Sequence, residues 1–223
     1  MKNKKIFLVI AIILLFVTLS FINISEKNND IDLKIPDNII KSIENGNYNE
    51  IDSSTNYIKI DVKDYGEIIA VLYPDVAPLT VDNIKKLISE MFYDGLIFHR
   101  VINNFMIQTG DPTGTGIYGS EETINGEFKD NGFNNVLSHT RGVLSMARKG
   151  SVPETSETYN SASSQFFIVQ TDSTHLDGKY AAFGKVIKGI EIVDKIASEE
   201  TNEDDKPIND IIINSIRFIE ISE

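Results

Sequence analysis

Two short apolar stretches carry polar side chains that could act together. In LIFHRVI, side chains alternate between the two faces of a strand, so Leu96, Phe98 and Arg100 share one face. In FMIQTG, Met106 and Gln108 share a face for the same reason. If the two strands pair, a guanidinium, an amide and a thioether lie beside one another on one surface.

The residues between the two stretches predict that they do pair. Asn103 and Asn104 separate the apolar runs and are typical of a tight hairpin turn. Across such a hairpin Arg100 lies near Met106 and Gln108. An arginine in a strand can also be the partner of a structural ion pair, so this pattern alone leaves both roles open.

Two further apolar segments supply residues of a similar kind. SASSQFFIVQ places Gln165 and Phe167 on one strand face, and HLDGKYAAFG contributes Leu176 just before a turn. Aromatic residues in strands also serve simply as core. From these residues alone we predict a groove for a peptide or a small molecule.

Other catalytic arrangements gain no support from the sequence. His99, His139 and His175 lie in unrelated segments, without the i, i+4 spacing of a zinc-hydrolase helix. The sequence has no G-x-S-x-G nucleophile motif. It also has no cysteine, which excludes disulfides, thiolate metal sites and a cysteine nucleophile.

The stretch GTGIYG, residues 114–119, matches the glycine pattern of a dinucleotide-binding loop. That function requires the glycines to lie between a strand and a helix, so that the pyrophosphate meets the helix N-terminus. Here Pro112 precedes the motif, and the residues after it lead towards another turn. We therefore reject a nucleotide-dependent oxidoreductase and interpret the glycines as a surface loop that turns tightly beside a ligand.

Short strands separated by turn signals dominate most of the chain. Alternating patterns predict a hairpin within residues 57–73 and strands at 143–147, 165–169, 181–186 and 211–221. Helical spacing predicts one helix after Pro78 and a second near residues 191–197. Because β-α-β alternation is missing, the sequence predicts a mostly antiparallel barrel or sandwich.

The first residues predict attachment to a membrane. The basic lead MKNKK precedes an uncharged apolar run, residues 6–24, which as a helix is long enough to cross a hydrocarbon core of about 30 Å. Lysines before the run direct the rest of the chain out of the cytoplasm. We predict a signal anchor over residues 1–24, a polar linker over 25–56 with at most a short helix after Pro36, and a domain over 57–223. A cleaved signal peptide is the alternative, although no A-x-A-like site follows the run.

The charge of the chain bears on its partners. The formal net charge is −12, and no basic patch longer than a few residues occurs. Such a chain is not attracted to phosphate backbones, so we expect no nucleic-acid partner.

Several ordered motifs resemble one known family. The run FHRVINNFMIQTGDPTGTGIYG is followed in the same order by GVLSMAR, SSQFFI and LDGKYAAFGKVIKG. This series is similar to the cyclophilins, the family of peptidyl-prolyl cis-trans isomerases, and the resemblance covers about residues 57–221. It implies a closed eight-stranded antiparallel β-barrel capped by two α-helices. With the N-terminal run, the expectation is a bacterial, membrane-anchored member whose barrel follows a transmembrane helix.

The resemblance also implies a role for individual residues and no metal or cofactor. The implied catalytic residues are Arg100 and Gln108. His175 stands where many eukaryotic members have a tryptophan, which implies weak binding of cyclosporin, and the long segment 149–161 is expected to reshape one rim. The implied substrate-binding residues line a proline pocket, contact the peptide backbone or flank the peptide: Phe105, Met106, Gly114, Thr115, Ala147, Arg148, Gln165, Phe167, Leu176 and Tyr180.

The activity implied by the resemblance is rotation about X-Pro bonds. Amide resonance opposes that rotation with a barrier of about 18 to 20 kcal/mol, which makes it slow enough to limit folding. The expected partners are proline-containing polypeptides that fold after export, at the outer side of the cell membrane. A noncatalytic peptide-binding module is the alternative, and the presence of Arg100 favours the enzyme. The sequence leaves the oligomeric state open.

Overall fold

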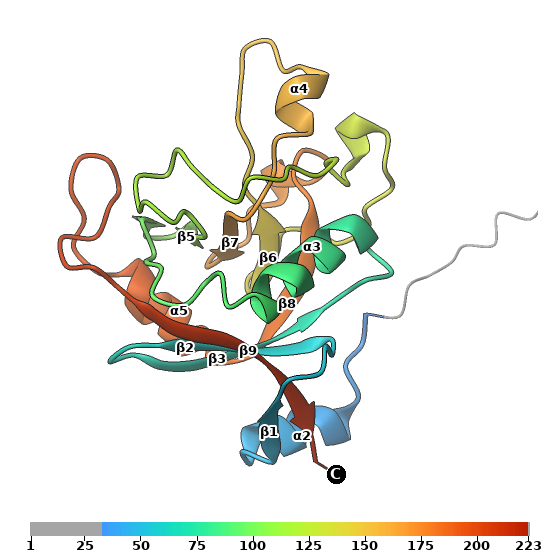
Figure 1. The fold of residues 1–223 in the computed structure, drawn as a ribbon, viewed down its shortest axis with the longest axis vertical. Helices are drawn as coiled ribbons and strands as arrows, with labels where there is room; N and C mark the ends of the chain where they lie inside the picture. Colours follow the sequence, from blue (N-terminus) through green and yellow to red (C-terminus); the bar gives the residue numbers. More distant parts are fainter. Residues whose placement is uncertain (1–32, 223) are drawn as a thin grey trace, which may run out of the picture. The chain divides into compact units, whose positions relative to one another are not determined.

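The computed structural model of the protein describes residues 33–222. The chain of Figure 1 contains helices α2 (Asp37–Glu44), α3 (Pro78–Ser89), α4 (Ser156–Tyr159) and α5 (Ile190–Ala197), and the short 3-10 helices η1 (Lys129–Asn131) and η2 (Thr174–Leu176). Its strands are β1 (Tyr48–Ile51), β2 (Tyr57–Val62), β3 (Gly66–Leu72), β4 (Arg100–Ile102), β5 (Met106–Thr109), β6 (Val143–Met146), β7 (Phe166–Val169), β8 (Ala182–Lys188) and β9 (Ile213–Ile221).

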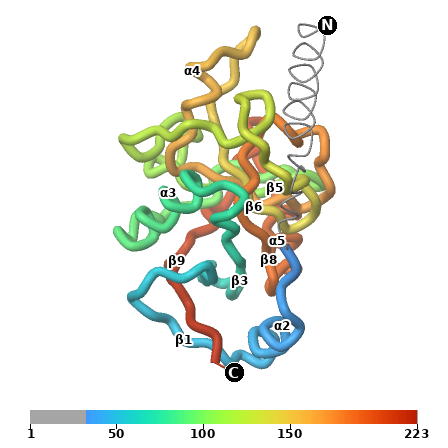
Figure 2. The backbone as a smooth tube through the Cα atoms, turned by 90° about the vertical axis from the view of Figure 1, so that its right-hand side faces the viewer, coloured from blue at the N-terminus to red at the C-terminus, as the bar shows by residue number. Residues whose placement is uncertain are grey.

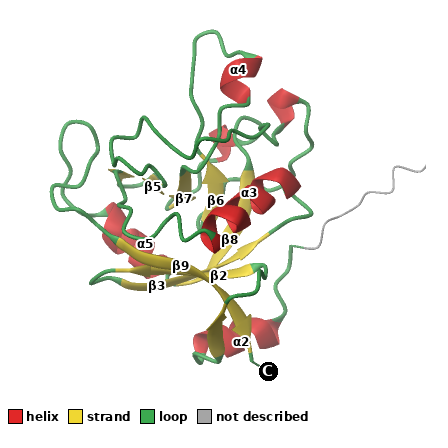
Figure 3. Cartoon of the chain, viewed as in Figure 1, coloured by secondary structure: helices red, strands yellow, loops and turns green. Residues whose placement is uncertain are grey.

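These nine strands form one antiparallel sheet in the order β1-β9-β2-β3-β8-β6-β7-β5-β4. The hairpin predicted within residues 57–73 is confirmed, since β2 pairs with β3 from Tyr57 opposite Val71 to Val62 opposite Gly66. Figure 3 shows that long loops gather around the β5, β6 and β7 part of the sheet, whereas β2, β3 and β9 run as longer, more regular strands. The loops therefore surround the strands that carry the predicted site residues.

The expectation of a closed eight-stranded barrel is wrong. The sheet has nine strands and is open, because β1 and β4 stand at its two ends and each pairs with one strand. On the side of β9 that does not face β2, part of the strand pairs with β1, from Ile51 opposite Phe218 to Tyr48 opposite Ile221. The chain before β4 meets the start of β9 through the isolated bridge between Ile97 and Ile212 and through a few backbone hydrogen bonds around it, but β4 and β9 are not paired as strands, so no ladder closes the sheet.

Two of the helices lie where periodicity predicts them and pack on one large core. The buried face of α3 includes Ile84, Leu87 and Ile88, and that of α5 includes Val193 and Ile196. Pro78 begins α3 at a position where the missing N–H costs nothing. The resemblance implies two helices, and the described residues hold two more. One is α2, at the place where the sequence allows a short helix after Pro36, and the other is α4, in the segment expected to reshape the groove rim.

Part of the predicted linker folds against the sheet. Ile43 of α2 is fully buried with Ile69 of β3 and Ile219 of β9, and β1 adds a strand beside β9. Figure 2 shows α2 and β1 at the end of the molecule where the chain terminates. The domain boundary at residue 57 stays a prediction, but residues 37–51 supply two elements that share a core with the domain.

The predicted membrane span, residues 6–24, lies outside the described residues. Between residues 33 and 222, no helix is both long and apolar enough to cross a membrane.

Candidate active site

The β4–β5 hairpin brings Arg100 and Gln108 together. The two residues face each other directly in the strand register, and Ile102 faces Met106. The turn predicted at Asn103-Asn104 is confirmed, because Phe105 donates its N–H to the carbonyl of Ile102 at 3.1 Å. Asn104 has φ +61°, a left-handed conformation that asparagine adopts more readily than most residues.

Pairing of β5 with β7 extends this surface. Gln108 lies opposite Phe167, and Met106 lies opposite Val169. Leu176 on η2 joins Met106 and Phe167 in an apolar cluster on which Phe105 and Tyr180 pack. Three segments that are distant in sequence therefore build one apolar surface beside Arg100.

This surface is the floor of a pocket of about 390 Å³, which we term the main pocket. It holds ten of the twelve residues predicted for catalysis or substrate binding. The complete lining is His99, Arg100, Phe105, Met106, Gln108, Thr115, Gly116, Ala147, Arg148, Phe167, Leu176, Tyr180 and Asp204.

Arg100 presents its charge at the edge of the apolar floor. The side chain is 43% exposed, and Nε donates to Oδ2 of Asp205 at 3.3 Å. Within residues 33–222 the two terminal nitrogens of the guanidinium form no hydrogen bond that would hold them away from the pocket. A guanidinium is always charged and carries its donors in one plane, so these nitrogens are available to a ligand.

Gln108 and Gln165 connect the pocket to the glycine-rich loop. Gln108 donates Nε2 to Oε1 of Gln165 at 2.8 Å, and Gln165 in turn donates to the carbonyls of Gly116 and Tyr118. The amide of Gln165 is thus used to hold residues 116–118. Oε1 of Gln108 accepts no hydrogen bond from any described residue and faces a pocket, so it is free to accept from a peptide N–H.

The loop itself is organised around Asp111. The Asp111 carboxylate accepts from the backbone of Thr113 and Tyr118 and from the Thr115 hydroxyl. Although burial acts in the opposite direction, these hydrogen bonds hold the pKa of Asp111 below its usual value. Gly116 has φ +81° and lies against the His99 ring, so the backbone turns tightly beside the pocket. This conformation agrees with the interpretation of the glycines as a surface loop that turns tightly beside a ligand.

A second, smaller cavity adjoins the main pocket. This side pocket has a volume of about 350 Å³ and shares Gln108, Gly116, Ala147 and Arg148 with the main pocket. Gln165 lines the side pocket together with Ile117 and Tyr118 of the glycine-rich loop and residues of the 149–161 segment. The two cavities adjoin through these shared residues and together form one groove.

The Arg148 side chain turns away from the groove and supports its rim. Only 3% of the side chain is exposed, and the guanidinium lies over the rings of Phe128, Tyr159 and Tyr180 at 4.8 to 5.3 Å. It pairs with Glu154 at 2.9 Å and donates to the Lys179 carbonyl. The sequence-based expectation that this residue flanks a peptide therefore concerns its backbone.

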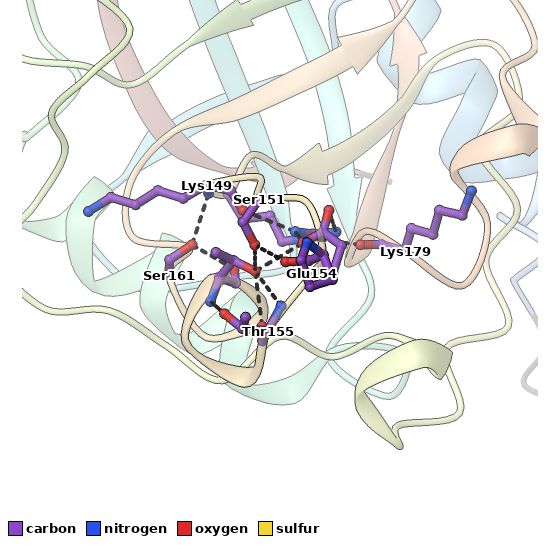
Figure 4. Close-up of polar contacts among 9 residues, drawn as sticks. Lys149, Ser151, Glu154, Thr155, Ser161 and Lys179 are labelled. Atoms are coloured by element: carbon purple, nitrogen blue, oxygen red, sulfur yellow. Dashed lines mark hydrogen bonds and ion pairs between the residues drawn. The ribbon is translucent and has the colours of Figure 1, made fainter.

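Hydrogen bonds within residues 149–161 fix the shape of the rim. Figure 4 shows Ser151, Glu154, Thr155 and Ser161 close together, with the Lys149 side chain pointing away from them. The hydroxyl of Ser161 accepts the backbone N–H of Lys149. Thr155 and Thr158 form a reciprocal capping box at the start of α4. Because Glu154 of this segment pairs with Arg148, the segment and the pocket wall form one connected unit.

Behind Phe167, a buried chain of polar groups supports the pocket floor. The ring of His139 stacks on that of Phe167, with the centroids 6.2 Å apart. Nδ1 of His139 lies 2.8 Å from Asp177, and Nε2 lies 2.9 Å from the Ser145 hydroxyl. Burial lowers the pKa of His139, and its hydrogen bond to Asp177 only partly opposes that effect. Since Ser145 is fully buried, we assign this chain a structural role.

Two predicted residues lie outside the main pocket, and three residues of its lining were not predicted. Gln165 lies in the side pocket, and Gly114 lines neither cavity. His99, Gly116 and Asp204 are the additions. Alternation along LIFHRVI predicts that His99 lies on the strand face opposite to Arg100, but β4 begins only at Arg100, so strict alternation does not hold before it. The roles of all these residues stay predictions.

The family comparison agrees with this geometry. Residues 57–218 match the family model described as "Cyclophilin type peptidyl-prolyl cis-trans isomerase/CLD". A peptidyl-prolyl cis-trans isomerase-like 1 of Aspergillus niger is 40% identical over 156 residues, which are 70% of this chain and 90% of that protein. A putative bifunctional phosphatase/peptidyl-prolyl cis-trans isomerase of Streptococcus pyogenes is 37% identical over 192 residues, and the match spans only 39% of its length.

Solved structures give the same result. A cyclophilin-type isomerase of Cryptosporidium parvum is 33% identical, with a TM-score of 0.64, over 75% of this chain and 99% of that one. The expected enzyme class is thus supported, whereas a bacterial source and membrane attachment stay predictions. The match of the family model to most of the chain, together with the Aspergillus relative, shows that this protein belongs to the cyclophilin family of peptidyl-prolyl cis-trans isomerases.

Proposed function

We propose that this protein accelerates cis-trans rotation about X-Pro bonds in polypeptides. The observation that carries the proposal is the Arg100 guanidinium, whose terminal donors stand free beside an apolar pocket formed by Phe105, Met106, Phe167 and Leu176. A second structure of the Cryptosporidium relative, 33% identical and with a TM-score of 0.62, was obtained in the presence of the dipeptide Ala-Pro. The use of an X-Pro dipeptide with that relative supports an X-Pro ligand for the main pocket here.

The chemistry requires no nucleophile. Rotation passes through a twisted amide in which the prolyl nitrogen loses its share of resonance, and this loss accounts for a barrier of about 18 to 20 kcal/mol. A charged donor directed at that nitrogen stabilises the twisted form more than either planar form. The apolar floor holds the proline ring while the preceding carbonyl turns, and Oε1 of Gln108 accepts a backbone N–H of the peptide.

The test is an exchange measurement on an X-Pro peptide by NMR, with the full-length chain in nonionic detergent. We expect acceleration by the wild type and a drop in kcat/KM of about a hundredfold or more in Arg100→Ala, the range for removal of one transition-state donor. Arg141→Ala is a matched control, because Arg141 is 41% exposed, close to the 43% of Arg100, but is paired with Asp194 and lines neither pocket. Equal activity in Arg100→Ala and Arg141→Ala would refute the role of Arg100.

A noncatalytic peptide-binding module remains the second candidate, because the same groove can hold a proline without turning it. The continuous groove formed by the two pockets favours binding of either kind. Peptide binding measured by fluorescence polarisation, without acceleration of exchange by folded wild-type protein, would select this candidate.

We further propose that the substrates are polypeptides folding outside the cytoplasm, and that the first 24 residues hold the protein at the cell membrane. Support comes from the sequence, where lysines precede a long uncharged apolar run. Protease added to intact cells is expected to remove the domain. Full protection of the domain in intact cells, with digestion after lysis, would refute this orientation.

A further inference from the structure

The main pocket carries one charged side chain whose charge is not matched by a partner. Its charged lining residues are Arg100, Arg148 and Asp204. Arg100 is paired with Asp205, and Arg148 with Glu154. The Asp204 carboxylate forms no hydrogen bond or ion pair with any residue of the described chain, and only its backbone N–H is used. The unbalanced charge of the pocket lining is therefore negative.

Asp204 is held in place by a well-defined turn. Oδ1 of Asn202 accepts the N–H groups of Asp204 and Lys206, each at 3.0 Å. The Asp205 carbonyl accepts the N–H of Val101, the neighbour of Arg100 on β4, at 2.8 Å. The turn is thereby fixed directly to the strand that carries Arg100, so Asp204 stands at the pocket in the absence of a substrate.

Nearby cationic groups do not offset the Asp204 charge. Lys206 extends towards Asp210, with 3.7 Å between Nζ and Oδ1. His99, the one histidine of the pocket lining, is almost fully buried, and burial lowers its pKa, so its ring is neutral at pH 7. A substrate residue that reaches this side of the pocket thus meets an exposed carboxylate.

We propose that Asp204 is a specificity-determining residue that favours substrates with a lysine or arginine next to the proline. Asp204 lines the main pocket and not the side pocket. A chain that places its proline ring on the apolar floor and extends into the side pocket would therefore bring the residue on the other side of the proline towards Asp204. This inference rests on the isomerase function proposed above. It identifies the substrate class as basic X-Pro or Pro-X sequences.

The expected effect is modest, because Asp204 is exposed to solvent. An exposed ion pair changes an equilibrium by up to about fivefold, and a like charge acts by a similar factor in the opposite direction. The ratio of kcat/KM for a lysine peptide to that for a glutamate peptide should therefore be about three to ten at low salt. It should approach one in about 0.5 M salt, where the Debye length is a few ångströms.

The experiment uses the full-length chain in nonionic detergent and a peptide series with lysine, glutamine or glutamate before or after the proline. We expect a lysine preference on one side of the proline that disappears in Asp204→Asn and turns into a glutamate preference in Asp204→Lys. Glu203→Gln is the matched control, because Glu203 is an exposed neighbouring acid that lines neither pocket. This substitution removes one negative charge, as Asp204→Asn does. It should keep the preference.

The outcomes separate the two proposals. Failure of the wild type to accelerate exchange in every peptide would refute the isomerase itself. Acceleration without lysine preference, or a preference that Asp204→Asn retains, would overturn the role of Asp204 and leave the isomerase in place. A preference lost equally in Glu203→Gln and Asp204→Asn would show a general effect of net charge and would also overturn it.

Discussion

Replacing Ile43 by alanine should destabilise the domain without changing its chemistry. Ile43 lies on α2, within the segment that the sequence predicts as a linker, yet its side chain is fully buried against Ile69 and Ile219. The Lys188 ammonium also donates to the Ile43 carbonyl at 3.2 Å, which favours the C-terminal end of that helix. If the segment were only a spacer, the substitution would have no effect on unfolding.

The magnitude follows from the packing around Ile43. A fully buried isoleucine cut back to alanine typically costs about 2 to 5 kcal/mol. The cluster around Ile43 has only three buried members, so it can partly relax, and we expect the lower part of that range, about 2 to 3 kcal/mol. For a domain of this size each kcal/mol lowers Tm by about 2 to 4 °C, which gives a decrease of about 4 to 12 °C.

The measurement is thermal unfolding followed by circular dichroism, together with kcat/KM well below Tm. Ile208→Ala is the control, because Ile208 is 58% exposed and should change stability by no more than about 0.5 kcal/mol. Since Ile43 lines neither pocket, kcat/KM should stay at the wild-type value. A Tm within about 1 °C of wild type would refute the attachment of α2 to the domain.

Two further predictions concern stability. Because burial lowers the pKa of His99 and of His139, the unfolded chain binds protons more readily than the folded one. The free energy of unfolding should therefore fall as pH drops below about 6.5, by at most about 1.4 kcal/mol per pH unit for each histidine, and Tm should fall with it. A Tm that is constant between pH 8 and 5 would contradict this. Arg148→Met should cost about 2 kcal/mol in denaturant unfolding, and more than Glu154→Gln, because the guanidinium also lies over three rings. Equal costs would show that the rings contribute nothing.

Local pairing explains which parts of the site could be predicted from the sequence. The β4–β5 hairpin depends on two apolar runs and the Asn103-Asn104 turn, so these local patterns predict that Arg100 lies near Gln108, and the structure places the two residues directly opposite each other. Phe167 and Leu176 join this hairpin through contacts between segments that are distant in the sequence, which no local pattern predicts. The family motifs predict their place in the pocket. Asp204 comes from a turn about a hundred residues further along the chain, and no local pattern links it to Arg100.

Errors in the predicted fold have a similar cause. The sequence allows a short helix after Pro36, where α2 forms, but the apolar pair Ile39 and Ile43 is too short a pattern to show that this helix packs on the sheet. The pairing of β1 with β9 is a contact across most of the chain. Sequence alternation reports which side of a strand is buried, and it carries no information on which edges meet, so it could not exclude the closed barrel.

The two arginines of the main pocket show why residue type alone does not assign a role. Both lie in or directly after apolar segments of the sheet region, and both line the same cavity. Arg148 is enclosed by three rings and a carboxylate, so its donors and its charge are consumed in holding the rim. Arg100 is held through Nε alone, which fixes the plane of the guanidinium while its terminal donors stay accessible. The terminal nitrogens therefore separate the two roles: those of Arg148 are bonded to Glu154 and to the Lys149 carbonyl, whereas those of Arg100 stay accessible to a substrate. Asp205, which holds Nε of Arg100, belongs to the same turn as Asp204.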